Sequence, residues 1–126
     1  MRDHETAMTV YVQLAVISDE KLQPQVRDRF LLLAGAEACR AGWPEVAARC
    51  RERLIASNPA HQISRHRSFA DALRDNEFQH LVAHWERYCP FEKAEAMLRP
   101  LQQADESSSN GSVGDRMLKF LETNSA

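Results

Sequence analysis

Glu77, His80 and His84 are the residues whose types and spacing best fit metal chemistry. They stand three and four positions apart, so in a helix they share one side. Two histidines at positions i and i+4 can bind the same zinc ion. Their order differs from the HExxH of zinc proteases, however, and no completing ligand is evident before the fold is known. We expect a solvated helix flank here, and we keep a small metal-binding domain or enzyme using these three residues as the alternative function.

A run of arginines in the middle of the chain is the second group with a chemical use. Residues 43–74 hold six arginines and three acidic residues, although the whole chain has a net charge of -2. The planar guanidinium donates two parallel hydrogen bonds to a carboxylate or a phosphate. The run therefore predicts a solvated helix face or, as the functional alternative, a surface for an acidic protein or peptide. The negative total charge argues against nucleic acid as the partner.

Trp43 joins this candidate surface for a separate reason. It stands in a predicted turn rather than on an apolar stripe, and tryptophan is enriched at binding hot spots. The alternative is that its ring packs within the hairpin. The candidate partner-binding residues are Trp43, Arg49, Arg51, Arg53, Arg65 and Arg67.

Motifs of covalent or cofactor-dependent catalysis do not occur in the sequence. It contains no GxSxG nucleophile elbow, no phosphate-binding glycine loop and no dinucleotide fingerprint. The three cysteines form no CxxC pair. Cys39 and Cys50, on either side of a turn at Gly42, are expected to pack in the core as small apolar side chains. The sequence predicts a non-enzymatic protein-interaction module, an adaptor or scaffold, that needs no cofactor.

The length of 126 residues fits one domain, and 44% apolar with 27% charged residues is an ordinary globular composition. The apolar runs are too short to span a bilayer, and the N-terminus lacks the pattern of a signal peptide. We therefore expect a cytoplasmic chain without membrane contact. Residues 1–103 are predicted to form a single helical domain, residues 104–115 a flexible Ser/Gly-rich linker, and residues 116–126 a short amphipathic tail.

The apolar spacing predicts an all-α fold of about five helices packed as antiparallel helix-turn-helix hairpins. Residues 30–36 are apolar on all sides, which predicts the buried centre of the domain. Residues 1–7 are polar and are expected to fray. Residues 8–17 combine β-branched content with helical spacing, and helix is favoured because no partner strand follows. Helices are expected over 24–41, 44–57, 69–74, 76–89 and 91–101.

Small residues at fixed positions distinguish residues 28–61. With Pro59 as the closing proline, Gly35 and Ala47 stand where two helices would cross and touch, and Gly42 stands in the turn. This segment resembles a tetratricopeptide repeat, a helix-turn-helix unit of about 34 residues. The resemblance implies that a concave groove binds a peptide or protein partner. The alternative is that the helices form an irregular bundle and not a repeat of this kind. The family prefers aromatic residues where this chain has Ala38, Pro44 and Arg51.

A second hairpin, residues 69–101, is predicted from the same helix-turn-helix layout, but it carries little of the repeat pattern beyond Ala94. After it, the Met117–Leu121 segment has apolar residues at helical spacing and is too short to be stable alone. We expect this segment to dock on a groove of its own chain, to stay loose, or to exchange into a second copy as a means of self-association.

Overall fold

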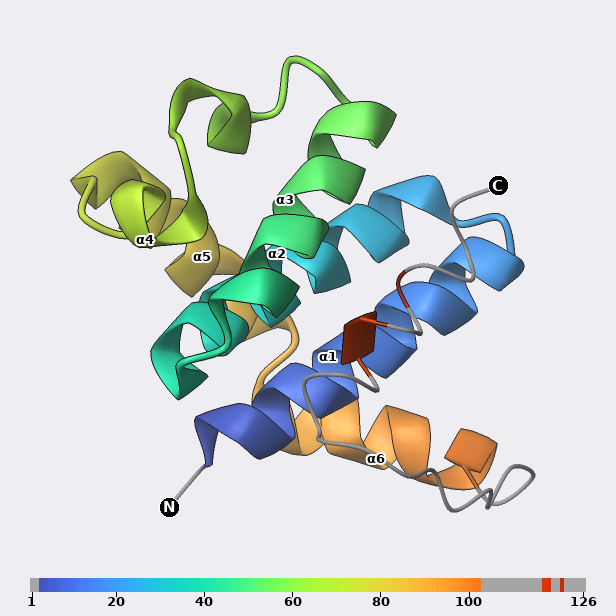
Figure 1. Cartoon of the computed structure of the whole chain (residues 1–126). Helices are drawn as coiled ribbons and strands as arrows, with labels where there is room; N and C mark the ends of the chain where they lie inside the picture. Colours follow the sequence, from blue (N-terminus) through green and yellow to red (C-terminus); the bar gives the residue numbers. More distant parts are fainter. Residues whose placement is uncertain (1–2, 103–116, 119–120, 122–126) are drawn as a thin grey trace.

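The computed structural model describes residues 3–102, 117–118 and 121, and it is helical throughout its regular parts (Figure 1). No strand occurs among these residues, so the all-α prediction is confirmed, including helix at residues 8–17. None of the described helices combines the length and apolarity that a membrane span needs. The elements are α1 (His4–Glu20), α2 (Pro24–Ala41), α3 (Pro44–Ser57), the 3-10 helix η1 (Gln62–Arg65), α4 (Phe69–Ala72), α5 (Asn76–Tyr88) and α6 (Phe91–Gln102).

Helix α1 begins earlier than the sequence predicts. The Asp3 side chain accepts a hydrogen bond from the backbone N–H of Glu5 at 3.1 Å, which caps the first turn. Ala7 and Met8 are fully buried. The expectation that residues 1–7 fray is therefore wrong for residues 4–7, because a capped first turn already contributes to the core.

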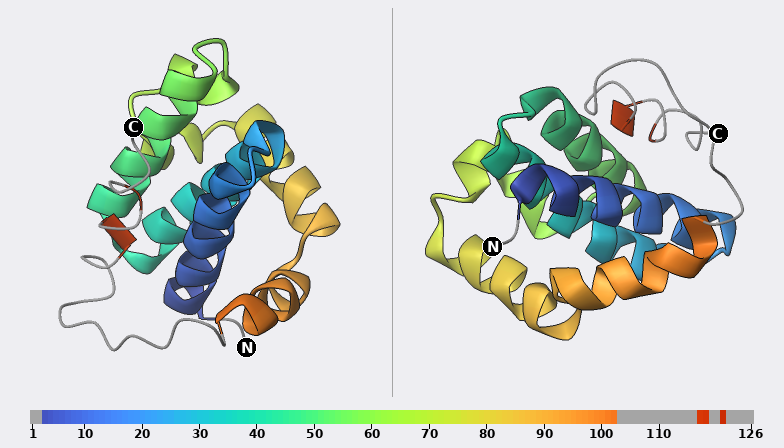
Figure 2. Two further views of the ribbon diagram at one scale, coloured as in Figure 1. Left: turned by 90° about the vertical axis from the view of Figure 1, so that its right-hand side faces the viewer. Right: turned by 90° about the horizontal axis from the view of Figure 1, so that it is seen from below.

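Helix α2 is the centre of the fold, as its sequence predicts. Every residue from Phe30 to Ala38 is buried. Helices α1, α3, α4 and α5 all contact α2 and surround it (Figures 1 and 2). The apolar run needs this surrounding, because a helix that is apolar on all sides has no face to give to water.

A left-handed glycine closes the α2–α3 hairpin. Gly42 has a φ of 83°, and the backbone N–H of Trp43 donates to the carbonyl of Ala38 at 2.8 Å, as in a Schellman cap. This confirms the predicted turn at Gly42, which is also the C-cap of α2. Pro44 then opens α3 at its first position, where a missing N–H is tolerated.

The sequence predicts that Gly35 touches Ala47 of α3. In the structure, the residue that comes nearest to Gly35 is Phe69 of α4. A Cβ built on Gly35 would lie 2.3 Å from two ring atoms of Phe69. Phe69 is itself buried and stacks edge-on against Phe78 of α5, with 6.0 Å between ring centroids. Because residue 35 has no side chain, the Phe69 ring fits against the backbone of α2, and this contact holds α4 on the central helix.

The second predicted hairpin opens out: α5 packs against α2, whereas α6 packs against α1. Figure 2 shows α6 passing beneath α1 at an angle to α5. The corner between the two helices is held by the Tyr11 hydroxyl, which donates to the carbonyl of Cys89 at 2.9 Å. Pro90 follows and separates the two helices.

A buried carboxylate ties three helices together. Glu37 of α2 is 0% exposed and contacts His4 of α1 and Arg40, each at 2.7 Å. Arg40 also contacts Glu86 of α5 at 3.0 Å. Hydrogen bonds to Glu86 and Glu37 outweigh the effect of burial and raise the pKa of Arg40. A buried charge of this kind is destabilising unless it is paired, so these partners fix the relative positions of α1, α2 and α5.

Substituting Gly35→Ala is expected to destabilise the fold by about 1–3 kcal/mol in urea denaturation, because the new methyl group overlaps the Phe69 ring. The better helix propensity of alanine offsets only part of this loss. Phe69→Leu removes the ring atoms that clash. A double-mutant cycle combines Gly35→Ala with Phe69→Leu. The stability loss of the double variant should be smaller than the sum of the losses of the two single variants. Additive losses would contradict the contact.

Candidate functional site

Trp43 is used inside the molecule. Its indole Nε1–H donates to Oε1 of Glu5 at 2.9 Å, and its ring is half-buried against the core. The side chain therefore joins the α2–α3 turn to the start of α1. This geometry corresponds to the packing interpretation of Trp43.

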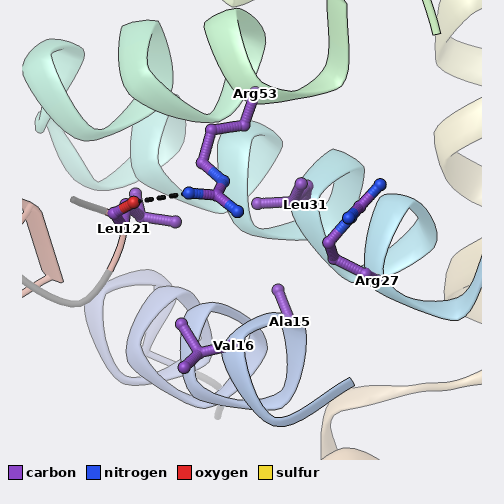
Figure 3. Close-up of a pocket in the computed structure, with 6 residues that line it drawn as sticks. All are labelled: Ala15, Val16, Arg27, Leu31, Arg53 and Leu121. Atoms are coloured by element: carbon purple, nitrogen blue, oxygen red, sulfur yellow. Dashed lines mark hydrogen bonds between the residues drawn. The ribbon is translucent and has the colours of Figure 1, made fainter. Parts of the chain in front are cut away.

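Arg51 and Arg53 of α3 bind opposite parts of the molecule. Arg51 donates to the main-chain carbonyl of His66 through Nε at 3.1 Å and Nη2 at 2.7 Å. Arg53 donates through Nη1 to the main-chain carbonyl of Leu121 at 2.7 Å (Figure 3). Two positions along a helix correspond to about 200° of rotation, so the two guanidinium groups cannot belong to one surface.

Arg53 lies in a charged network at the meeting point of three helices. Its Nη2 is 3.6 Å from Asp19 of α1, and Asp19 also contacts Arg27 of α2 at 2.6 Å. Burial lowers the pKa of Arg53 below that of an ordinary arginine, although Asp19 opposes the shift. Arg27 also forms an ion pair with Asp28 at 3.1 Å and donates a hydrogen bond to the hydroxyl of Ser57 at the end of α3. This network joins the ends of α1, α2 and α3 and serves the fold.

Arg49 pairs with Glu52 one turn along α3, at 3.2 Å on the surface. Such exposed pairs contribute roughly 0.2–1 kcal/mol. Of the six predicted partner-binding residues, Trp43, Arg51 and Arg53 are therefore committed to internal contacts and Arg49 to a surface pair. The structure does not gather the six into one surface.

Arg65 and Arg67 remain exposed on the segment that follows α3, which we call the basic loop (residues 61–74). Arg74, which belongs to the arginine-rich stretch 43–74 but was not among the predicted partner-binding residues, is exposed at the other end of the same segment. The guanidinium groups of these three arginines make no hydrogen bond or ion pair within the described part of the chain. The basic loop contains one acidic residue, Asp71. The charge count over residues 43–74 includes Arg74 and was the signal that could have added it to the candidates.

The backbone of the basic loop is firmly anchored. Ile63 and Phe69 are buried, and the Arg51 side chain holds the carbonyl of His66. Two local caps add to this: Nδ1 of His61 accepts from the N–H of Ile63 at 3.0 Å, and the Ser68 hydroxyl accepts from the N–H of Asp71 at 3.1 Å. The arginines thus project from a fixed backbone, as α3, η1 and α4 all contact one another here.

His66 contacts Asp71, the one acidic residue of the basic loop. Its Nδ1 is 3.8 Å from Asp71, its Nε2 is 3.4 Å from Asp75, and its ring meets Phe78 edge-on with centroids 5.8 Å apart. The Asp71 carboxylate also accepts from the backbone N–H of Arg67 at 3.4 Å. Asp71 is itself exposed, but its carboxylate forms no ion pair with the guanidinium groups of the described arginines.

Glu77, His80 and His84 do not form a metal centre. Glu77 and His80 are exposed, whereas His84 lies against Trp85 and Tyr88, with ring centroids 4.6 and 4.9 Å apart. Among the described residues, no three His, Cys, Asp or Glu side chains are grouped so that they could hold a metal ion. The helical spacing places the trio on one side of α5, but no described residue from another element completes it.

The cysteines are free thiols in the core or at its edge. Burial raises the pKa of Cys50 to about 12, so at neutral pH this thiol is protonated and a poor nucleophile. Burial likewise raises the pKa of Cys89. Cys39 is half-buried against the core, in line with the predicted packing role.

The chain matches no protein-family model, no curated protein and no solved structure. The resemblance of residues 28–61 to a tetratricopeptide repeat therefore stays a prediction, while the helical hairpin that it implies is present as α2 and α3.

Acidification is expected to loosen the basic loop through His61. Burial lowers the pKa of His61 from its usual 6.5, and only the unprotonated Nδ1 can accept the N–H of Ile63. The unfolded chain then binds a proton more readily than the folded chain. Stability from this group is full above pH 6.5 and is lost as the pH falls through the folded pKa.

The measurement is urea denaturation across this pH range, with His61→Asn as the matched control. Asparagine can cap the same N–H but does not titrate. The wild-type chain should lose stability relative to the variant on acidification. Parallel pH profiles of the two proteins would contradict the role of His61.

Proposed function

We propose that the chain is a non-enzymatic helical protein-interaction domain and that its partner is an acidic protein segment bound at the basic loop. The observation that carries the proposal is the exposure of Arg65, Arg67 and Arg74 on an anchored backbone without intramolecular acid partners among the described residues. Each planar guanidinium can take a carboxylate in a two-point contact. A partner with two or three acidic side chains in a row would match them.

The anchoring of the loop favours binding. Association costs conformational entropy, and the cost is lower where the backbone is already ordered. Buried Ile63 and Phe69, together with the Arg51 contact, order this backbone before a partner arrives. The long arginine side chains are then the main groups that lose freedom on binding.

A protein partner fits the loop better than a nucleic acid. Binding of single strands usually adds aromatic side chains on which bases stack. Phe69, the single phenylalanine of the basic loop, is buried under α2, and the loop contains no Trp or Tyr. The net charge of -2 also opposes a polyanion, whose field acts over the whole surface.

Reversing the charge at Arg65, Arg67 and Arg74 to glutamate is expected to weaken binding of a short Glu- and Asp-rich synthetic peptide by about tenfold or more at low salt. Fluorescence anisotropy of the labelled peptide measures the affinity at several salt concentrations. The wild-type affinity should fall as salt rises, and that of the triple variant should change little.

The matched control reverses Lys21, Arg87 and Arg99, which are exposed on other parts of the surface. This variant has the same net charge as the loop variant. It should keep most of the wild-type affinity for the peptide. Binding at one site depends on where the charges lie, whereas general electrostatic attraction depends only on the net charge. Equal losses in both triple variants, or no binding by the folded wild-type chain, would overturn the proposal.

A further inference from the structure

The imidazole of His66 lies between two carboxylates beside the exposed arginines of the basic loop. Its Nδ1 is 3.8 Å from the carboxylate of Asp71 in α4, and its Nε2 is 3.4 Å from that of Asp75, the N-cap of α5. The His66 side chain is only 17% exposed, and its ring packs edge-on against buried Phe78. A carboxylate thus faces each nitrogen of a largely buried ring.

Only the charged form of the ring suits both carboxylates. An imidazolium has an N–H on each nitrogen, whereas the neutral imidazole has an N–H on one nitrogen and a lone pair on the other. When the ring is neutral, one of the two aspartates therefore faces a lone pair that repels it. Histidine is the side chain that changes between these two forms in the range of about pH 5 to 8. The contacts of His66 with both aspartates consequently depend on pH in this range.

The backbone of His66 is fixed, and its two acidic partners are free to move. The N–H of His66 donates to the carbonyl of Ile63 at 3.0 Å, and the carbonyl of His66 accepts two hydrogen bonds from Arg51. The side chains of Asp71 and Asp75, by contrast, are 48% and 39% exposed. Loss of the proton from His66 therefore releases aspartate side chains while the loop backbone stays in place.

A released Asp71 competes with an outside acid for the arginines. Its carboxylate accepts a hydrogen bond from the backbone N–H of Arg67 at 3.4 Å, so it already lies beside the proposed binding residues. A carboxylate of the same chain acts at a high effective concentration and can occupy a guanidinium that an acidic segment would otherwise bind. A proton on His66 removes this competitor and adds a positive charge next to the arginines. Both effects strengthen the binding of an acidic segment as the pH falls.

We propose that His66 makes the basic loop a pH-sensitive binding site. Its imidazolium holds Asp71 and Asp75, leaves the exposed arginines to an acidic protein segment, and raises the affinity for that segment on acidification from about pH 8 to about pH 6. This inference rests on the proposed function of the loop and adds its regulation. By linkage, the bound segment in turn favours the protonated form of His66.

The other titratable groups around His66 determine how the test is designed. Arginine side chains keep their charge throughout this range, and carboxyl groups ordinarily titrate near about pH 4. The second histidine of the loop, His61, changes charge for a different reason, because its protonation breaks the cap on Ile63. The charged residues adjacent to His66 or to its two aspartates are Arg51 of α3, Arg65 and Arg67 in the loop, and Glu77 of α5.

The test measures binding of the labelled Glu- and Asp-rich peptide to the full chain by fluorescence anisotropy at both pH values and constant low ionic strength. Every protein carries His61→Asn, which keeps the cap on Ile63 and removes the other titrating group of the loop. In this background the affinity should rise at least about threefold on acidification. Adding His66→Gln should abolish the rise, because the amide gains no charge.

A second variant removes the acids and keeps the histidine. Asparagine at residues 71 and 75 can still accept the backbone hydrogen bonds from Arg67 and Glu77. In the same background, Asp71→Asn with Asp75→Asn should therefore bind the peptide more tightly at the higher pH and gain less on acidification. Glu45→Gln with Glu92→Gln makes the same change in net charge at exposed positions outside the loop, and it should retain the full pH dependence.

The matched control for His66→Gln is His80→Gln, at an exposed histidine of α5 outside the loop, which should leave the rise in affinity unchanged. Circular dichroism confirms that each variant is folded, and the double asparagine variant decides if His66→Gln is not. Equal affinities at the two pH values in the background chain, or a full rise after His66→Gln, would overturn the inference and leave the proposed function standing. Absence of peptide binding at both pH values would remove the proposed function and this inference together.

Discussion

The absence of a side chain at Gly35 is the constraint on which the arrangement of the middle of the chain depends. The Phe69 ring takes the space where a Cβ would lie, so α4 sits directly on the central helix. Phe78 of α5 then packs on Phe69, and His66 packs on Phe78. The contact therefore positions α4, α5 and the basic loop together. Within the basic loop, Phe69 thus adds a third buried side chain to those of Ile63 and Ala72.

Burial decides which arginines serve the fold and which can serve a partner. Arg27, Arg51 and Arg53 are half-buried, and each satisfies its donors with carboxylates, a hydroxyl or main-chain carbonyls. A guanidinium that left those partners unpaired would carry a large desolvation penalty, so these three are not available for an outside ligand. The side chains of Arg65 and Arg67 are exposed and carry no such penalty. Arginines within a short stretch of chain thus have two different environments, and only the exposed ones suit the proposed role.

Local patterns predicted the helices well because caps and 3.6-residue spacing are local signals. The apolar run around Leu32 predicted the buried centre, and Gly42 predicted the hairpin turn, both correctly. The approach of Phe69 to Gly35 and the bond from Tyr11 to Cys89 could not be predicted, because each joins residues far apart in the sequence.

The candidate site divides in the same way. Charge counting found Arg65 and Arg67 because their exposure follows from a polar loop. It could not find that Arg51 and Arg53 are used internally, because their acceptors are the carbonyls of His66 and Leu121. These two bonds leave α3 on opposite sides, so contacts on both sides fix the helix. The network of Arg27, Asp19 and Ser57 holds its end. Counting arginines along the sequence therefore overestimates the surface that is open to a partner, because two of the guanidinium groups on α3 are already used inside the fold.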